Sequence, residues 1–215
     1  MIVVRDAAPG DVNAIADLHL LAFPGYFLPH LGRRFLRMFY AFFLVNEGSH
    51  CIVAVDGDKV IGLVAGTAAE TQHYTAFYRR KFIQIAFIVS ARFLRSPVIR
   101  REIFKRMGYL RLAAAALLRP GARSSATRED GSDRPPARLL SIAVHPDHRG
   151  AGVAERLTGS LFSSLYRDGA RRVGLTVRSD NGRAIAFYKK DGWTVQNTTS
   201  ESVTFQRELE EEKSA

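Results

Sequence analysis

The stretch HPDHRGAGVAERL, residues 145–157, joins an apolar run to a helical pattern, and this junction decides the fold of the C-terminal third. The run before it, LLSIAV at residues 139–144, predicts a buried strand. Two glycines therefore lie at a strand-to-helix junction, where free backbone N–H groups and the helix dipole favour an anion. The residues after it repeat an apolar side chain at every fourth position, as one face of a helix does: Val153, Leu157, Leu161 and Leu165.

Strand and helix patterns alternate through the rest of this third of the chain. Such alternation predicts an α/β layer with at least one parallel pair of strands. The expected strands are residues 138–144, 171–177, 193–195 and 202–207, and the expected helices are residues 151–167 and 181–190.

The N-terminal third predicts a strand at residues 2–5, a helix that begins near Asp11, and a hairpin of strands at residues 51–56 and 60–68. The one cysteine, Cys51, lies in a strand-like run, so we expect a buried core residue and no internal disulfide. An aromatic stripe at helical spacing predicts a second helix that lines the core or a groove: Phe35, Phe39, Phe42 and Phe43.

The middle third carries the whole net charge of +10. Residues 70–138 contain 15 Lys or Arg and 5 Asp or Glu, which suggests an acidic partner such as a nucleotide, a nucleic acid or an anionic membrane. We expect a basic helical insertion at residues 70–137, with a helix over residues 78–118 that breaks at Pro97. Residues 119–136 are rich in Pro, Gly and Ser and predict a mobile loop.

The length of 215 residues fits one domain, 1–215, with the insertion inside it. The lack of paired cysteines favours a reducing compartment. The N-terminus shows no signal-peptide pattern, and no uncharged apolar run reaches the ~18–20 residues of a membrane-spanning helix. We therefore expect a cytoplasmic protein without a transmembrane segment, with peripheral membrane contact through the basic residues as an open alternative.

Four interpretations of the glycine loop compete. A Walker loop needs GxxxxGK[ST], which is absent, and a dinucleotide fingerprint fails at Glu155, where its third glycine would stand. A structural turn is the third interpretation. The fourth is the pattern Arg-x-x-Gly-x-Ala, which Arg149, Gly152 and Ala154 complete. This pattern resembles the pyrophosphate loop of the GCN5-related N-acetyltransferases, the GNAT superfamily.

Further motifs in the order and spacing of that superfamily extend the resemblance to residues 1–69 and 138–207. The opening VVRDAAPGDVNAIADL is similar to its first strand and helix. The resemblance implies an α/β (α+β) fold: a mixed central sheet of six to seven strands flanked by helices, with the insertion between the third and fourth strands. The other matching residues are Val144-His145-Pro146, Asn181, Ala184, Phe187-Tyr188 and Gly192-Trp193.

The resemblance also implies an N-acetyltransferase in which a primary amine attacks the thioester of acetyl-CoA directly. Acetyl-CoA is then a co-substrate, and no metal is expected. Small loop residues let a diphosphate approach the backbone, and an N–H at the strand end polarises the thioester carbonyl. The residues expected to bind acetyl-CoA are Ile142, Ala143, Val144, Arg149, Gly150, Ala151, Gly152, Val153, Ala154 and Asn181.

Tyr188 matches the general acid of the resembling family, which protonates the departing thiolate. Phenol and thiol pKa values near ~10 and ~8.5 make this transfer reasonable. Asn181 is expected either to hydrogen-bond the pantetheine or to cap its helix. The general base stays open, because the strand at residues 138–144 has no carboxylate. Glu70, His73 and a chain of waters are the candidates.

The acceptor is the least defined part of this hypothesis. The insertion lies where the acceptor pocket of the resembling family generally lies, so we expect it to shape or cover that pocket. Three alternatives stay open: an anionic acceptor such as a nucleotide-linked amino sugar, membrane docking through residues 78–118 near a lipid-linked sugar, or a helical cap with solvated charges. The competing function is a non-catalytic module of the same fold that binds an acyl-CoA, a membrane surface or a nucleic acid.

Overall fold

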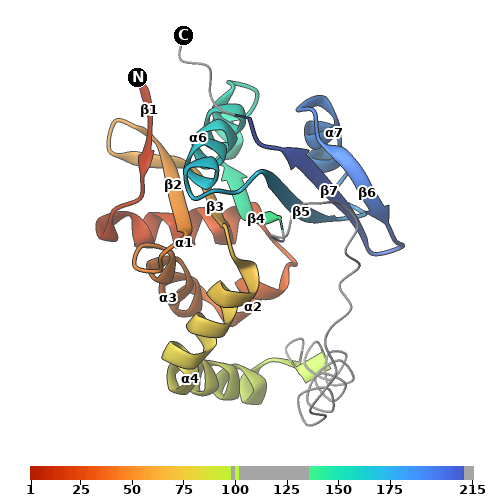
Figure 1. Cartoon of the computed structure of the whole chain (residues 1–215). Coiled ribbons are helices and arrows are strands. Elements are labelled where there is room, and N and C mark those ends of the chain that lie inside the picture. The colour runs from red at the N-terminus through yellow and green to blue at the C-terminus, as the bar shows by residue number, and fades with distance from the viewer. Residues whose placement is uncertain (98–99, 102–135, 211–215) are drawn as a thin grey trace.

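The computed structural model describes residues 1–97, 100–101 and 136–210, and Figure 1 shows a central sheet with helices packed against it. The strands are β1 (Ile2–Asp6), β2 (Ser49–Asp56), β3 (Lys59–Thr67), β4 (Ala137–Val144), β5 (Arg172–Arg178), β6 (Thr194–Thr198) and β7 (Ser202–Glu208). The helices are α1 (Val12–Ala22), α2 (Phe27–Leu31), α3 (Arg33–Phe43), α4 (Glu70–Arg95), α6 (Val153–Arg167) and α7 (Gly182–Lys190), with short 3-10 turns at Pro9–Asp11 and Pro146–His148.

The seven strands form one mixed sheet in the order β1-β2-β3-β4-β5-β7-β6. Among the described strands, β4 and β5 are the one parallel pair, and they pair only at Ala137 with Val173 and at Arg138 with Gly174. Beyond these residues β4 stays paired with β3 as far as Val144, and β5 stays paired with β7. A gap therefore opens in the middle of the sheet. The expected α/β fold with a mixed sheet of six to seven strands is confirmed.

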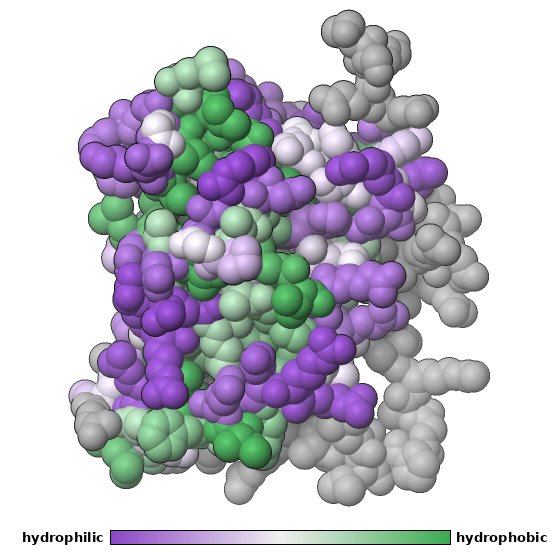
Figure 2. All heavy atoms as spheres, turned by 90° about the vertical axis from the view of Figure 1, so that its left-hand side faces the viewer, coloured by the Kyte–Doolittle hydropathy of each residue, from purple (hydrophilic) through white to green (hydrophobic). Residues whose placement is uncertain are grey.

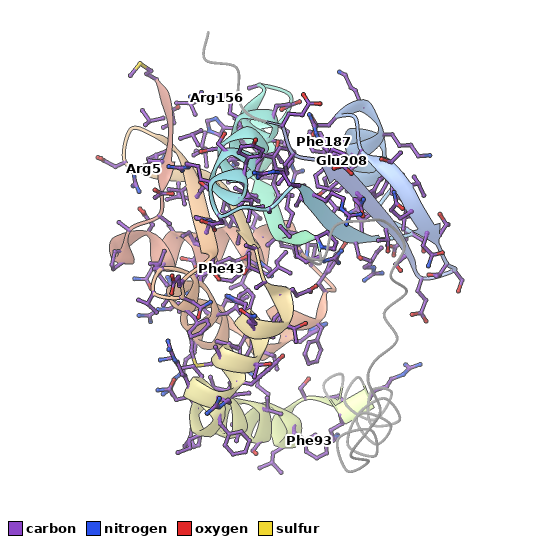
Figure 3. The ribbon with its side chains drawn as sticks, viewed as in Figure 1. Arg5, Phe43, Phe93, Arg156, Phe187 and Glu208 are labelled. Carbon is purple, nitrogen blue, oxygen red and sulfur yellow. The ribbon has the colours of Figure 1, made fainter. Side chains whose placement is uncertain are left out.

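Two apolar cores lie on the two faces of the sheet. One is formed with α1, α3 and α4, and it contains the aromatic stripe of α3, including Phe43 (Figure 3), as predicted. Cys51 is buried in the same core, and burial raises the pKa of its thiol to about 12, so the predicted core role is confirmed. The other core is formed with α6 and α7, through residues such as Leu157 and Leu161.

Close packing of α6 on β3 depends on two glycines. A Cβ on Gly62 would lie 2.9 Å from Cδ1 of Leu157. A Cβ on Gly66 would lie 2.9 Å from the carbonyl oxygen of Arg138 and 2.9 Å from Cδ2 of Leu161. These contacts set the distance between helix and sheet, and with it the position of the loop that precedes α6.

We expect Gly66→Ala to lower the free energy of unfolding by about 1–3 kcal/mol, because a backbone oxygen and a buried leucine leave no space for a methyl group. Gly159→Ala in α6 is the matched control. A Cβ there meets no atom within 4 Å, and alanine favours a helix interior over glycine by roughly 0.5–1 kcal/mol. Urea unfolding measures both variants, and equal stabilities would contradict the close packing.

The helix predicted over residues 78–118 is wrong at its start. α4 begins at Glu70, because the residues after β3 already continue a helical pattern that buries His73 and Phe77 against α3. The helix ends before Pro97, as predicted. The rest of the prediction, residues 102–118 and most of the loop at 119–136, lies outside the described residues. Within the part of the chain that is described, no helix has the length and apolarity needed to cross a membrane.

Candidate functional site

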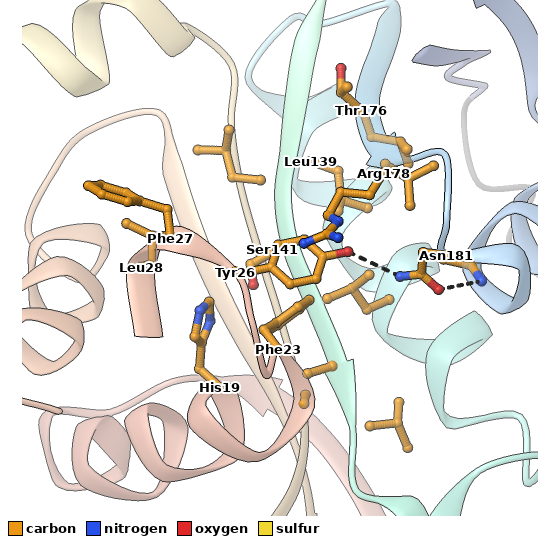
Figure 4. Close-up of a pocket in the computed structure, with 18 of the residues that line it drawn as sticks. His19, Phe23, Tyr26, Phe27, Leu28, Leu139, Ser141, Thr176, Arg178 and Asn181 are labelled. Carbon is orange, nitrogen blue, oxygen red and sulfur yellow. Dashed lines mark hydrogen bonds between the residues drawn. The ribbon is translucent and has the colours of Figure 1, made fainter. Parts of the chain in front are cut away.

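The gap between β4 and β5 belongs to a cavity of about 1520 Å³, part of which Figure 4 shows. Its walls come from β4, β5, the end of α1, α2, the start of α6, α7 and one face of α4. A site for one small molecule usually measures ~300–1000 Å³. The cavity therefore has room for one long ligand and a second, smaller one.

β4 presents backbone groups to this gap. The N–H of His145 donates to the carbonyl oxygen of Ile61 at 2.7 Å, so these residues form a hydrogen-bonded pair of the β3–β4 ladder. Such pairs alternate along an antiparallel ladder, so the backbone of Ala143 faces β3, whereas the N–H groups of Ile142 and Val144 face the gap. All three residues line the cavity, but the expectation that the Ala143 backbone faces a ligand needs correction, because its backbone is directed to β3.

The loop before α6 holds two glycines in the left-handed region, with φ of +79° at Gly150 and +72° at Gly152. Gly152 is the N-cap of α6 and supplies no side-chain cap, so within the described chain the first-turn N–H groups have no side-chain cap. Gly150, Val153 and Ala154 line the cavity, whereas Ala151 and Gly152 lie just outside the lining. The cavity thus reaches an open helix N-terminus, where backbone donors and the helix dipole suit an anion.

Arg149 ties this loop to the end of β4. Its Nε donates to the carbonyl oxygen of Val144 at 3.2 Å, and the side chain lines the cavity. The other guanidinium donors of Arg149 have no partner among the described residues, so they are available to an anion at the loop.

α7 and its N-cap carry two of the expected site residues, Tyr188 and Asn181. Oδ1 of Asn181 accepts from the N–H of Ala184 at 3.2 Å, so this side chain caps the helix. Tyr188 is 5% exposed, and its ring packs against Trp193 and Phe205. Burial raises the pKa of the Tyr188 phenol, so the hydroxyl stays protonated at neutral pH. That hydroxyl has no hydrogen-bond partner in the described chain, and Tyr188 lines the cavity.

A segment between α1 and α2 reaches across to the far wall of the cavity. Nδ2 of Asn181 donates to the hydroxyl of Tyr26 at 3.2 Å, across 155 positions of sequence (Figure 4). The guanidinium of Arg178 lies 5.1 Å from the centre of the Tyr26 ring and donates to the carbonyl oxygen of Gly25 at 3.4 Å. This strap, residues 23–26, was not predicted from the sequence. The cluster of aromatic residues around Pro-Gly between two helical patterns was the available signal.

A buried polar chain runs from α1 to β4 beside the cavity. Nδ1 of His19 lies 2.7 Å from the hydroxyl of Tyr40, and that hydroxyl donates to Oγ of Ser141 at 3.0 Å. Burial lowers the pKa of His19 to about 4 and raises the pKa of Tyr40. His19 and Ser141 line the cavity, but neither Tyr40 nor His19 was singled out from the sequence.

Neither expected candidate for the general base lines the cavity. Glu70 pairs with Nε of Arg138 at 3.1 Å. His73 is 1% exposed, with Nδ1 at 2.7 Å from Oγ of Ser49 and its ring 4.3 Å from that of Phe43. The expectation that these residues reach the amine is therefore corrected. Both residues lie in the first turns of α4, where they face the core or the sheet.

Two carboxylates reach the cavity from the described residues. They are Glu155, in the first turn of α6, and Asp180, which is paired with Arg178 at 2.5 Å. In the described part of the chain, no group of three or more His, Cys, Asp or Glu side chains is arranged to hold a metal ion. The cavity therefore offers neutral donors and acceptors, rather than carboxylates, beside the middle of β4.

Comparison with known proteins agrees with this geometry. A family profile described as the Acetyltransferase (GNAT) family matches residues 106–193. An acetyltransferase of Sodalis glossinidius is 37% identical over 57 residues, which are 26% of this chain and 40% of that protein. An acetyltransferase of Pectobacterium atrosepticum is 33% identical over 72 residues, or 34% of this chain and 48% of that protein. The chain thus spans less than half the length of these curated relatives.

The likeness to solved structures covers nearly the whole chain. SsHAT superimposes with a TM-score of 0.63 at 22% identity, covering 98% of this chain and 99% of that one. The PaiA N-acetyltransferase of Thermoplasma acidophilum, solved in complex with coenzyme A, gives a TM-score of 0.59 at 11% identity, over 97% and 99% of the two chains. At these identities the likeness shows a shared fold.

Proposed function

We propose that this chain is a member of the GNAT superfamily of acetyltransferases and that it transfers an acetyl group from acetyl-CoA to the primary amine of a small molecule. One observation carries the proposal: the unpaired edge of β4 and the open N-terminus of α6 line the same cavity. An extended chain with amide groups fits the first feature, and a diphosphate fits the second. The coenzyme A in the Thermoplasma acidophilum structure supports the same assignment.

The proposed roles of the residues follow from their positions. Ile142 and Val144 hydrogen-bond the pantetheine arm through their backbone, as a neighbouring strand would. Gly150 and the first-turn N–H groups of α6 receive the diphosphate, and Arg149 adds a charged donor. Asn181 holds the strap and α7 in place by its two hydrogen bonds.

Acetyl-CoA supplies an activated thioester, so the protein's task is chiefly to position the reactants. The N–H of Ile142 donates to the thioester carbonyl oxygen as negative charge develops on it. Tyr188 donates the proton of its hydroxyl to the departing sulfur. The two donors lie on opposite walls of the gap, one on β4 and one on α7.

The acceptor site in this proposal is the part of the cavity enclosed by the strap, α2 and α4. Its described lining is rich in aromatic rings, among them Phe23, Tyr26, Tyr74 and Phe77. Such rings pack well against the faces of sugars and bases, which supports an amino sugar or a nucleotide-linked amino sugar as the acceptor. The basic residues of α4 favour an acceptor that carries negative charge.

Two measurements on the full chain test this function. Titration with acetyl-CoA by calorimetry should show a single site, and a screen of amines with detection of the released thiol should show turnover. Binding without turnover for any amine would favour the non-catalytic acyl-CoA module. Neither binding nor turnover would overturn the proposed function.

A second proposal concerns the exposed face of α4, where Phe82, Ile83, Phe87 and Leu94 are all more than 60% exposed. α4 lies at the lower end of the molecule in Figure 1, and at that end Figure 2 shows hydrophobic and strongly hydrophilic side chains next to one another. Exposed basic residues of the same helix include Arg79, Arg80 and Arg92. Exposed apolar side chains next to basic ones suit binding at the surface of an anionic membrane, and we propose that α4 docks there.

We expect the protein to bind anionic vesicles at low salt, to lose that binding steeply at high salt, and to ignore neutral vesicles. Replacing Phe82 and Phe87 by Ser should weaken binding at least tenfold, because their burial in the membrane would be lost. Val45→Ser, at another exposed apolar position, should leave it unchanged. Sedimentation with vesicles measures the affinity of the parent, of the double variant and of Val45→Ser. A loss of affinity in Val45→Ser equal to that of the double variant would contradict docking through α4.

A further inference from the structure

One basic atom beside the acceptor site lacks a partner. Three buried side-chain atoms have no hydrogen-bond partner among the described residues: Nε2 of His19, Nε2 of His73 and Nε of Arg138, which has only its ion pair with Glu70. Of these three residues, His19 alone lines the cavity. Its side chain is 4% exposed, and in Figure 4 its ring rises from α1 into the space beside the strap. A buried nitrogen without a partner is costly unless a ligand supplies one.

The hydrogen bonds of His19 fix which of its nitrogens bears the lone pair. The Tyr40 hydroxyl gives its own hydrogen to Oγ of Ser141, so its oxygen accepts from Nδ1–H of His19. Nε2 is then the unprotonated nitrogen and acts as a hydrogen-bond acceptor. Because burial lowers the pKa of His19 to about 4, the ring stays neutral at physiological pH and keeps this acceptor available.

The same hydrogen bonds also fix where Nε2 of His19 lies relative to the thioester site. Ser141 anchors the chain on β4, next to Ile142, whose N–H faces the gap. The His19 ring also packs against Phe23, the first residue of the strap, with ring centres 4.5 Å apart. His19 is therefore held between the strand end and the strap, on the side of the sheet that the aromatic acceptor wall occupies.

We propose that Nε2 of His19 is the general base that receives the proton of the attacking amine, a role that rests on the proposed acetyl transfer. The neutral amine donates one N–H to Nε2. This hydrogen bond aims the lone pair of the amine nitrogen at the carbonyl carbon of the thioester, whose oxygen is held by the Ile142 N–H. As the C–N bond forms, the proton passes from nitrogen to Nε2. The C–S bond breaks, the Tyr188 proton passes to sulfur, and the products are an amide and a thiol.

The protonation states are restored through solvent: His19 releases the proton it took, and Tyr188 regains the one it gave. A weak base suffices for this step, because an amine nitrogen becomes far more acidic as it acquires positive charge on attack. The cost of a buried imidazolium in turn favours prompt release of the proton, which suits a catalyst that must turn over.

His73 offers a matched control inside the same molecule. It is also buried, its Nε2 also lacks a partner, and burial lowers its pKa to about 4 as well. It does not line the cavity. A general effect of losing a buried histidine should therefore appear in both variants, whereas loss of the base should appear only at His19.

The experiment compares His19→Gln with His73→Gln in the full chain, using the best amine from the screen. We expect kcat of His19→Gln to fall at least tenfold and acetyl-CoA affinity to stay within twofold. Its remaining kcat should rise more steeply with pH between 7 and 9 than that of the parent, since hydroxide replaces the base while both proteins need the neutral amine. His73→Gln should retain the parent's kcat and pH profile.

Tyr40→Phe is the second variant, because it keeps the histidine and removes only the group that fixes its tautomer. We expect an intermediate fall in kcat, with the circular dichroism spectrum unchanged. A His19→Gln protein that folds, binds acetyl-CoA and keeps kcat within twofold of the parent would overturn the role of His19 and leave acetyl transfer standing. If His19→Gln does not fold, an unchanged kcat in Tyr40→Phe overturns it. A parent that turns over no amine overturns the proposed function itself.

Discussion

Gly152→Asp should weaken acetyl-CoA binding about a hundredfold while the protein stays folded. An aspartate at the N-cap accepts hydrogen bonds from the first-turn N–H groups of α6, which the diphosphate needs. Its charge also repels the phosphates: two unit charges 4 Å apart interact by about 4 kcal/mol at an effective dielectric constant near 20. Solvent and salt reduce this figure at a half-open site, and a loss of ~2.7 kcal/mol corresponds to a hundredfold rise in Kd.

The fold should survive because the position tolerates this side chain. A Cβ on Gly152 meets no atom within 4 Å, and its φ of +72° lies in the region that Asp and Asn enter most readily after glycine. Gly152→Asn is therefore the matched control, with the same backbone cost and nearly the same size but no charge. We expect a loss of affinity at least tenfold smaller than that of Gly152→Asp.

Calorimetric titration with acetyl-CoA at low and high salt measures the effect. The difference between the Asp and Asn variants should shrink at high salt, because screening weakens the charge term. Equal losses in the two variants would mean that size, not charge, matters at this position. Unchanged affinity in both would place the diphosphate elsewhere and remove the assignment of the loop.

Tyr188→Phe should lower kcat about a hundredfold and leave acetyl-CoA affinity within twofold. General acid catalysis typically contributes ~10²–10⁴-fold, and a thiolate is a tolerable leaving group, which favours the lower end. The phenylalanine ring keeps the contacts of Tyr188 with Trp193 and Phe205, so only the hydroxyl is lost. Since that hydroxyl has no partner among the described residues, the thermal stability should not fall.

Steady-state kinetics at saturating acetyl-CoA, with chemistry shown to be rate-limiting, provide the test. Tyr166→Phe, on α6 and outside the cavity lining, is the matched control and should keep the parent's kcat. A kcat for Tyr188→Phe within a factor of two of the parent would make Tyr188 a packing residue. A large loss of acetyl-CoA affinity would instead mean that its hydroxyl holds the pantetheine.

The sequence by itself determined the elements whose signals are local. An apolar run, two glycines and a four-residue apolar repeat predicted β4, the loop and α6, because strand and helix periods and cap residues are set by near neighbours. The same local reasoning predicted the helix that carries Asn181 and Tyr188, and it placed the aromatic stripe of α3 in the core. The sequence-based prediction was wrong at the start of α4. Residues 70–77 fit a helix and a loop about equally well by their local pattern, and only the core that buries them decides for the helix.

Only the tertiary structure decided the acceptor side of the cavity. The strap is joined to α7 by a bond between Tyr26 and Asn181 across 155 positions, and the polar chain joins Tyr40 to Ser141 across 101 positions. No local pattern specifies such partners, since a buried polar group is satisfied by whatever the fold packs against it. Likewise, His19 and His73 look alike in the sequence, and they differ only because α1 packs one beside the gap in the sheet and α4 packs the other into the core.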